Sequence, residues 1–217
     1  KNIGLDLGLL NNRLNMTADI YVRDTKDMLM ASKDLPNVYG ASSPKTNAAN
    51  LRTKGWEASI SWNDSFNLKG KAFHYSVVLG LADNTTKVTK YNNDNKTLGT
   101  PYEGQQLGEI WGYVVDGLFK TDEEAENYPV NQSYVNNILN ISVKSQGLHA
   151  GDVKYVDLDG DNIISPTLSA NDVKDQKVIG NSLPRYTYSV RLAADWNGID
   201  FSAAKIFPKV LINLPAL

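Results

Sequence analysis

Hydrophobic and polar residues alternate with a period of two along several segments of this chain. Because successive side chains of a β-strand point to opposite faces, this pattern predicts strands with one hydrophobic and one polar face. The Asn11-Asn12 pair lies between two such segments and suits a turn, since Asn tolerates positive φ. Residues 3–30 are therefore predicted to form a hairpin. Its hydrophobic positions are Ile3, Leu5, Leu7 and Leu9, then Leu14, Met16, Ala18, Ile20 and Val22.

The same alternation returns at residues 56–62, 73–81 and 186–196. The last segment is 11 residues long, and a tilted transmembrane strand needs ~9–11 residues. The Asn197-Gly198 dipeptide that follows it favours a two-residue hairpin loop.

Two architectures produce this alternation: a transmembrane β-barrel, and a soluble sheet with one solvent-exposed face. Aromatic residues lie near the ends of the hydrophobic faces, at Trp56, Trp62, Tyr186 and Trp196. Membrane barrels place aromatic girdles at both interfaces, and a water-filled lumen tolerates charges on the polar face. Periodicity by itself leaves both architectures open.

Long polar segments separate the alternating ones. Residues 31–51 are rich in Ser, Asn, Pro and Ala, and residues 90–182 show little clear alternation. Such a stretch is uncommon in a compact soluble domain, whereas outer-membrane barrels alternate long extracellular loops with short periplasmic turns. Residues 122–128 hint at a short helix, capped by Thr121.

Composition narrows the classes of function. The chain has 22 Lys and Arg against 24 Asp and Glu, which provides no basic field for nucleic acid. It has no cysteine, which excludes disulfides, thiolate metal sites and Cys nucleophiles. No hydrophobic run approaches the ~20 residues of a spanning helix, and no signal peptide is visible. These features are consistent with a soluble β protein and also with a fragment of a membrane β-barrel whose export signal lies upstream.

Several segments together resemble the SusC/RagA family of TonB-dependent outer-membrane transporters. They cover residues 2 to about 203 in the family's order, and their agreement in register is more specific than any single motif. They read NIGLDLGLLNNRLNMTADIYVRDTKDMLM, NLRTKGWEASISW, YSVVLGLADNTTKV, EGQQLGEIWGYVVDGLFKTDEEAENY, GDVKYVDLDGDNII and VIGNSLPRYTYSVRLAADWNGIDFS.

This resemblance implies an all-β fold, the antiparallel strands of a plugged transmembrane β-barrel of about 22 strands. Residues 1–203 would supply later strands of that barrel, with residues 90–182 as a long loop region. The lipid-facing residues would be Leu14, Ile20, Ile60, Val77, Val190 and Leu192, and the lumen-facing residues Asp19, Glu57, Arg191 and Asp195.

The resemblance also implies a function without catalysis, the import of glycan oligomers or peptides across the bacterial outer membrane. The implied partners are a SusD-like lipoprotein and TonB, the latter through an N-terminal region absent from this sequence; no cofactor is required. The alternative is a soluble secreted β-sandwich that binds carbohydrate or calcium.

The end of the chain departs from the family pattern. After Ala203 the family continues with an aromatic-rich run, whereas this chain reads Ala204-Lys205-Ile206-Phe207-Pro208 and ends at Leu217. Pro208 and Pro215 suit a sheet interior poorly. Residues 204–217 are therefore expected to be an atypical tail from a frameshift or from cloning.

Residues 157–163 resemble the first half of an EF-hand-like calcium loop. Carboxylates at alternate positions let three hard oxygens converge on one cation, with a backbone carbonyl as the position-7 ligand. Position 12 is Leu168, and the family pattern suggests that SPTLSAN is an insertion that defers the last ligand. The candidate ligands are Asp157, Asp159, Asp161, Ile163 and Asp172. The alternative is an acidic turn on a solvated loop.

No catalytic residue is predicted. The two histidines, His74 and His149, have no partner at triad or zinc-site spacing. Trp111, Tyr113 and Phe119 are weak candidates for stacking on sugar rings, and packing within the loop is the alternative for these aromatic residues.

Overall fold

The computed structural model describes residues 1–31, 40, 44–138 and 147–212. The chain divides into two compact units, and each is described by itself. Unit 1 comprises Lys1–Lys90 and Leu183–Leu211, and unit 2 is built on Tyr91–Ser182. No helix among the described residues is long and hydrophobic enough to cross a membrane.

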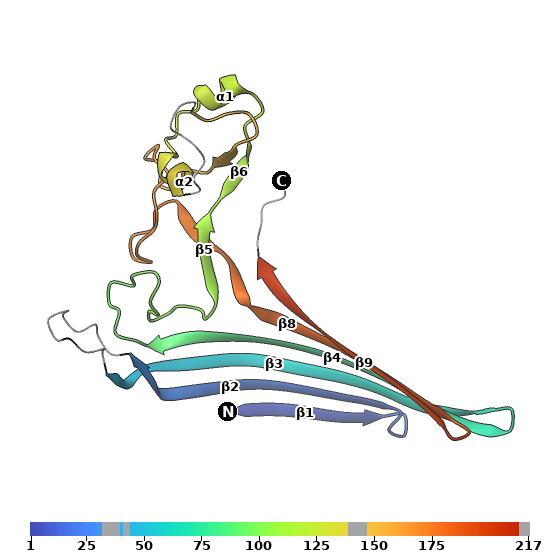
Figure 1. The fold of residues 1–217 in the computed structure, drawn as a ribbon. Coiled ribbons are helices and arrows are strands. Elements are labelled where there is room, and N and C mark those ends of the chain that lie inside the picture. Colours follow the sequence, from blue (N-terminus) through green and yellow to red (C-terminus); the bar gives the residue numbers. More distant parts are fainter. Residues whose placement is uncertain (32–39, 41–43, 139–146, 213–217) are drawn as a thin grey trace. The chain divides into compact units, whose positions relative to one another are not determined.

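Unit 1 is an antiparallel sheet of long strands in the order β1-β2-β3-β4-β8, and β9 also pairs with β8 (Figure 1). The sheet does not close on itself within the described residues, as expected for part of a barrel. β8 begins in unit 2, and its residues from Leu183 onward belong to unit 1. The strands are β1 (Asn2–Leu9), β2 (Leu14–Ala31), β3 (Lys45–Leu68), β4 (Lys71–Lys90), β8 (Gln176–Trp196) and β9 (Ile199–Ile212).

The strand register places hydrophobic residues beside hydrophobic residues across the sheet. Ile60 pairs with Met16 on one side and Leu79 on the other, and Leu79 pairs with Val190. These side chains are open to their surroundings, with Ile60 43% and Leu79 49% exposed. An uncovered hydrophobic face of this kind is costly in water and suits contact with lipid.

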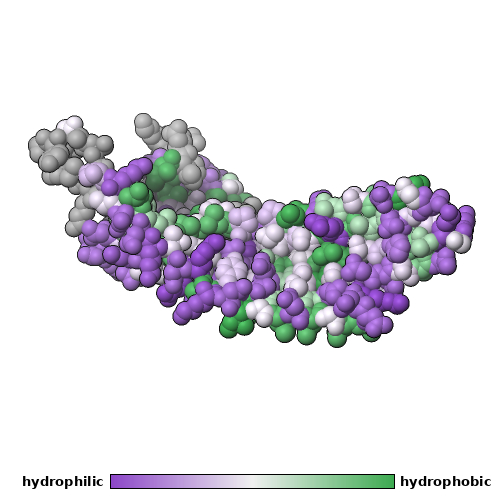
Figure 2. All heavy atoms as spheres, turned by 90° about the horizontal axis from the view of Figure 1, so that it is seen from below, coloured by the Kyte–Doolittle hydropathy of each residue, from purple (hydrophilic) through white to green (hydrophobic). Residues whose placement is uncertain are grey.

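The predicted facing assignments follow this register without a break. The residues predicted to face lipid share the hydrophobic face, and those predicted to face the lumen share the polar face. Seen from the side of β1, hydrophobic and neutral surface is gathered over the middle of the strands, with hydrophilic surface toward their ends (Figure 2).

Tight turns close one end of the sheet. Asn197 and Gly198 have φ values of 50° and 82°, which confirms the predicted two-residue turn, and Lys69-Gly70 closes another hairpin in the same way. The predicted turn at Asn11-Asn12 is present and also includes Leu10, which has positive φ too.

The strands run further than the alternation predicted. β3 begins at Lys45, inside the segment expected to be a loop, and β8 begins at Gln176. The added lengths carry polar residues on both faces, so they show no hydrophobic period. Register irregularities fall in these outer parts, between Thr25 and Leu29 on β2 and between Asn50 and Leu51 on β3.

β9 continues to Ile212 and includes Pro208, whereas an atypical tail was expected after Ala203. Among the described residues β9 pairs only with β8, so Pro208 lies on an edge strand, where a missing N–H is tolerated. The proposed origin of residues 204–217 stays a prediction, and residues 213–217 lie outside the described part of the chain.

Unit 2 has a small hydrophobic core where the sequence predicted a long loop region. Val135, Tyr155 and Ile164 form its centre. Thr121 caps the first helix as predicted, since its Oγ1 accepts a hydrogen bond from the backbone N–H of Glu124 at 3.1 Å. The elements are β5 (Glu109–Tyr113), which pairs with the start of β8, β6 (Val115–Leu118), which pairs with β7 (Val153–Tyr155), α1 (Asp122–Glu126) and α2 (Ser133–Ile138).

Candidate functional site

The polar face of unit 1 brings two predicted lumen residues together. Asp19 on β2 and Glu57 on β3 are direct cross-strand partners. Asp19 accepts a hydrogen bond from Asn2 Nδ2 at 3.1 Å, and no ion pair involves either carboxylate among the described residues. Two residues along each strand, on the same face, the hydroxyl groups of Thr17 and Ser59 are hydrogen-bonded at 2.8 Å.

A shallow hollow of about 260 Å³ lies over the middle of this face. Gly80, which pairs with Ser59 and Ser189, is one of the residues that line it, and the hydroxyl group of Ser189 takes the space that a Cβ atom on Gly80 would need. Hydroxyl and carboxylate groups of Asp19, Glu57 and their neighbours surround it. The arrangement provides hydrogen-bonding groups on an open wall and contains no activated nucleophile.

Nearby, Gly55 makes room for an aromatic ring. Tyr21 is the cross-strand partner of Gly55, and a Cβ atom on Gly55 would lie 2.5 Å from Tyr21 Oη and 2.9 Å from the backbone oxygen of Asp83. Glycine is therefore required here by close packing, in the GWE motif that contributed to the family resemblance.

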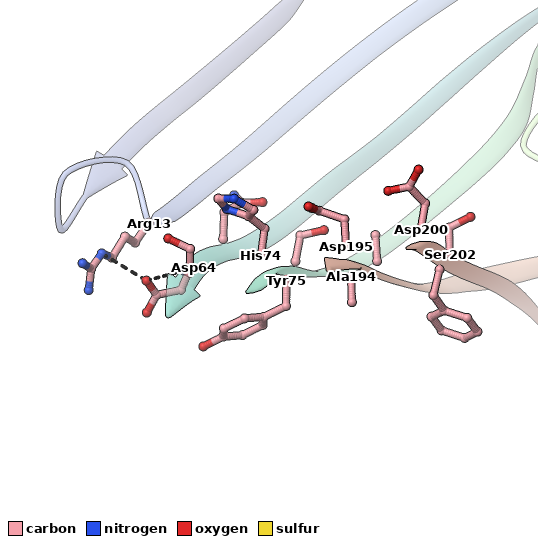
Figure 3. Close-up of a pocket in the computed structure, with 13 residues that line it drawn as sticks. Arg13, Asp64, His74, Tyr75, Ala194, Asp195, Asp200 and Ser202 are labelled. Atoms are coloured by element: carbon pink, nitrogen blue, oxygen red, sulfur yellow. Dashed lines mark hydrogen bonds and ion pairs between the residues drawn. The ribbon is translucent and has the colours of Figure 1, made fainter. Parts of the chain in front are cut away.

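A second hollow, of about 560 Å³, lies at the turn end of the sheet. Figure 3 shows His74, Asp195 and Asp200 on one side of the sheet, with Tyr75 and Ala194 on the other. His74 is the direct cross-strand partner of Asp195. Arg191, the fourth predicted lumen residue, pairs across the sheet with Val78 on β4.

The hydrophobic face carries an aromatic group at its turn end. The rings of Phe66, Phe73 and Tyr75 lie with centroids 5.1–6.3 Å apart, and Trp62 Nε1 donates a hydrogen bond to Tyr75 Oη at 3.1 Å. Trp196 Nε1 donates to the backbone oxygen of Leu68 at 3.3 Å. These rings with a polar tip are suited to a membrane–water interface.

A second aromatic group lies further along the same face. Tyr186 and Tyr188 have centroids 6.5 Å apart, and Trp56 belongs to the same cross-strand row as Tyr186 through Asp83. The Phe73–Trp196 row and the Asp83–Tyr186 row are ten residues apart. At ~3.3 Å per residue and a tilt of ~45°, this corresponds to roughly 23 Å in height. Membrane barrels have a hydrophobic band of about that height, ~25 Å.

In unit 2, the acidic loop at residues 157–163 is held by its own backbone. Asp157 accepts hydrogen bonds from the backbone N–H groups of Gly160 and Asn162, at 2.7 and 2.8 Å. Asn162 has a φ of 62°, the conformation expected of Asn in this position. Partial burial acts to raise the pKa of Asp157, but the N–H donors outweigh it, so this pKa lies below its ordinary value.

Part of the predicted calcium ligand set converges. Carboxylate oxygens of Asp157 and Asp159 lie within 4.8 Å of one another and of a third carboxylate, that of Asp175. Asp161 and Asp172 do not belong to this group. Asp161 accepts a hydrogen bond from the backbone N–H of Ile163 at 2.7 Å, and Asp172 has an exposed side chain. The calcium site stays a prediction.

Sequence reasoning missed Asp175 as a member of this group. Asp175 is fully buried and accepts hydrogen bonds from the backbone N–H groups of Leu158 and Ser165, at 2.8 and 2.7 Å. Lys174 Nζ lies 3.4 Å from Asp159 Oδ2, so a cation of the chain itself neutralises part of the acidic charge. The signal in the sequence was weak, a single acidic residue directly before β8.

The three aromatic candidates for substrate contact differ in access. Phe119 is 1% exposed and packs edge-on against Tyr128 at 5.1 Å, which leaves no free ring face in this arrangement. Tyr113 packs against Tyr155 in the core of unit 2. Trp111 is partly exposed, and its Nε1 donates a hydrogen bond to Glu109 Oε1 at 3.0 Å. Trp111 and Tyr113 are thus both partly exposed, whereas Phe119 is buried, and a role of these residues in substrate contact stays a prediction.

The long antiparallel strands, their two chemically distinct faces and the two aromatic bands define part of the wall of a β-barrel. Residues 1–207 match the family described as TonB dependent receptor-like, beta-barrel, and the chain belongs to this family. The family resemblance and the all-β fold predicted from the sequence are thereby confirmed.

Two curated relatives come from Formosa agariphila. TonB-dependent receptor P39 is 30% identical over 233 residues, which cover 93% of this chain and 21% of that protein. TonB-dependent receptor P3 is 27% identical over 199 residues, which cover 86% of this chain and 18% of that protein. The chain thus spans about a fifth of the length of the curated relatives it matches. These proteins are receptors and not enzymes, which confirms the prediction of a non-enzymatic chain.

Solved structures support the same fold. A structure of the RagAB peptide transporter matches with a TM-score of 0.57 at 19% identity, covering 94% of this chain and 20% of that chain. The RagAB peptide importer in its open-open state matches with a TM-score of 0.60 at 20% identity, covering 94% and 19%.

Proposed function

We propose that this chain forms part of the wall and the extracellular loops of a TonB-dependent outer-membrane transporter that imports bulky nutrients. The observation that carries the proposal is the register of unit 1, which is continuous between the two aromatic rows and separates an exposed hydrophobic face with two aromatic bands from a polar face. Lipid outside and an aqueous lumen inside account for both faces.

The orientation follows from the connections. Tight turns at residues 69–70 and 197–198 close one end of the strands, and a long connection leaves the other. In outer-membrane barrels the short turns are periplasmic and the long loops extracellular. Unit 2 would then belong to the extracellular side.

The cargo and the partners are part of the same proposal. The names of the solved neighbours mention peptide import, which favours peptides among the predicted cargoes; glycan oligomers are the other predicted class. A SusD-like lipoprotein and TonB are proposed as partners from the family resemblance. The polar wall would hydrogen-bond passing cargo weakly through hydroxyl and carboxylate groups, without any covalent step.

A soluble β-sandwich is the competing architecture, and the structure of unit 1 argues against it. A sandwich buries one face of each sheet under a second sheet. In unit 1 the hydrophobic face is open among the described residues, as the 65% exposure of Ile20 shows.

Membrane fractionation of the intact natural protein that contains this segment tests the proposal. We expect it in the outer membrane, with a shift in gel mobility on boiling, because a closed barrel resists detergent until heated. A soluble protein whose mobility does not change on boiling would contradict the proposal.

A further inference from the structure

Three basic side chains gather on the hydrophobic face of unit 1, just beyond its outer aromatic row. Arg52 on β3 and Lys87 on β4 are direct cross-strand partners, and Lys54 lies two residues along β3 from Arg52. The register between β3 and β4 is continuous from Leu51 to Leu68, so these three residues share the face of Trp56. We call Arg52, Lys54 and Lys87 the basic cluster.

The basic cluster is exposed and only partly neutralised. All three residues are exposed. Asp24, the other cross-strand partner of Arg52, forms an ion pair with it at 2.6 Å. No ion pair involves Lys54 or Lys87 among the described residues. The cluster therefore keeps a charge of about +2, and like charges directly opposite each other on a sheet are unfavourable unless an anion lies between them.

The height of the cluster indicates what that anion is. Lys54 and Arg52 lie two and four residues beyond Trp56, which is roughly 5 and 9 Å in height at ~3.3 Å per residue and a tilt of ~45°. The headgroup layer of a bilayer extends ~5–8 Å beyond the hydrocarbon on each side. The cluster thus reaches the layer that holds the phosphate groups of lipids, on the side that faces lipid.

We infer that the basic cluster binds a phosphorylated lipid headgroup of the outer leaflet. The inference rests on the proposed function, because it needs the aromatic row at Trp56 to mark the outer interface. Lysine and arginine are well suited to this partner, since both donate charge-assisted hydrogen bonds to phosphate oxygens. The long hydrocarbon stems of Lys54 and Lys87 can lie along the apolar surface while their ammonium groups reach the headgroups.

The test uses the full-length natural protein in lipid nanodiscs, with bisphosphorylated lipid A as the probe and dephosphorylated lipid A as its matched control. The variant is Lys54→Gln with Lys87→Gln, and the control variant is Lys69→Gln with Lys71→Gln, which removes the same charge at the turn end. We expect binding of bisphosphorylated lipid A to weaken about fivefold for each lysine removed from the cluster. The control variant should bind as the wild type does.

Equal binding by the wild type and the Lys54→Gln, Lys87→Gln variant would overturn the inference, and so would equal binding of the two forms of lipid A. Competition by millimolar inorganic phosphate that abolishes lipid binding would show a free-anion site and overturn the assignment to lipid. Fractionation and the boiling shift are recorded on the same preparations. A protein absent from the outer membrane defeats the proposed function itself, whereas a heat-modifiable barrel with no lipid preference defeats only this inference.

Discussion

Asp19 and Glu57 lie directly opposite each other on the polar face, and neither carboxylate is paired with a cation among the described residues. Like charges in this cross-strand position repel and destabilise the sheet. In the proposed barrel this cost would be borne in the lumen, where water screens the two charges. The pair therefore indicates that the residues on this face are not selected for stability alone.

Replacing one member of this pair should stabilise the protein. We expect Glu57→Gln to raise the free energy of unfolding of the full-length barrel by roughly 0.2–1 kcal/mol, because it removes the repulsion and keeps the shape. Denaturant unfolding from lipid vesicles measures it. Glu57→Asp keeps the charge and serves as the control. A loss of stability in Glu57→Gln would show that an unseen cation pairs with this carboxylate.

Because adjacent residues of a strand lie on opposite faces, substitutions at Val190 and Arg191 should differ in their effect on stability. Val190 pairs with Leu79 in the middle of the hydrophobic face, and Arg191 follows it on the polar face. We expect Val190→Arg to destabilise the full-length barrel by ~2–4 kcal/mol near the bilayer midplane, and Arg191→Ala much less. Unfolding in lipid vesicles measures both, and equal costs would reject the facing assignment.

Gly55 should resist even a single added methyl group. A Cβ atom at this position would meet Tyr21 Oη and the backbone oxygen of Asp83 at 2.5 and 2.9 Å. We expect Gly55→Ala to destabilise by about 1–3 kcal/mol, since overpacking forces neighbouring groups to move. Adding Tyr21→Ala should recover part of this loss, but not the part due to the backbone of Asp83. A double-mutant cycle on the unfolding free energy shows whether the two effects are coupled.

Two tyrosines of unit 2 should respond differently to loss of their hydroxyl groups. Burial raises the pKa of Tyr113 to about 12, and among the described residues its Oη is buried without a hydrogen-bond partner. Burial and a hydrogen bond to Glu109 raise the pKa of Tyr102 to about 12 as well. Tyr113→Phe should be neutral or stabilising by up to ~1 kcal/mol, whereas Tyr102→Phe should destabilise by about 1–2 kcal/mol. Hydrogen exchange of unit 2 in the full-length protein distinguishes the two.

The acidic loop should loosen in acid. Because the pKa of Asp157 is lower in the folded loop than its ordinary value of 3.8, its contribution is complete well above pH 3.8 and is lost as pH falls through the folded-state pKa. The protection factors of the Gly160 and Asn162 amides, which are corrected for the intrinsic pH dependence of exchange, should therefore fall below that pH. Asp157→Asn should exchange fast already at neutral pH and change less on acidification.

Hydrogen exchange of the same loop, residues 157–163, also tests the predicted calcium site. Calcium bound by Asp157 and Asp159 would slow exchange of residues 157–163 relative to a chelator, and Asp157→Asn would abolish the difference. Exchange that is identical with calcium and with chelator would instead assign the role of counter-ion to Lys174, which lies 3.4 Å from Asp159.

The sequence predicted the parts of the fold that a bilayer constrains. In the proposed barrel, residues 14–22 and 186–196 present a hydrophobic face to lipid, so their alternation is strict and their pairing follows. Lys45–Gly55 and Gln176–Arg185 carry polar residues on both faces, so the alternation that predicts a strand is missing there. Within unit 2, Asp175 completes the acidic group from 18 residues beyond Asp157, and a search by local spacing could not reach it. The burial of Phe119 depends on its tertiary packing against Tyr128, so it could not be predicted from the sequence either.

The register irregularities of β2 and β3 fall outside the segment between the aromatic rows. A residue inserted between Trp56 and Trp62 would turn Ile60 into the lumen and Ser59 toward lipid, since a shift of one residue exchanges the two faces of a strand. A residue inserted near Asn50 can be absorbed as another bulge. Length variation among descendants of this gene should therefore accumulate at the outer ends of the strands, where new contacts with the cell's surroundings can arise while the span across the membrane keeps its length.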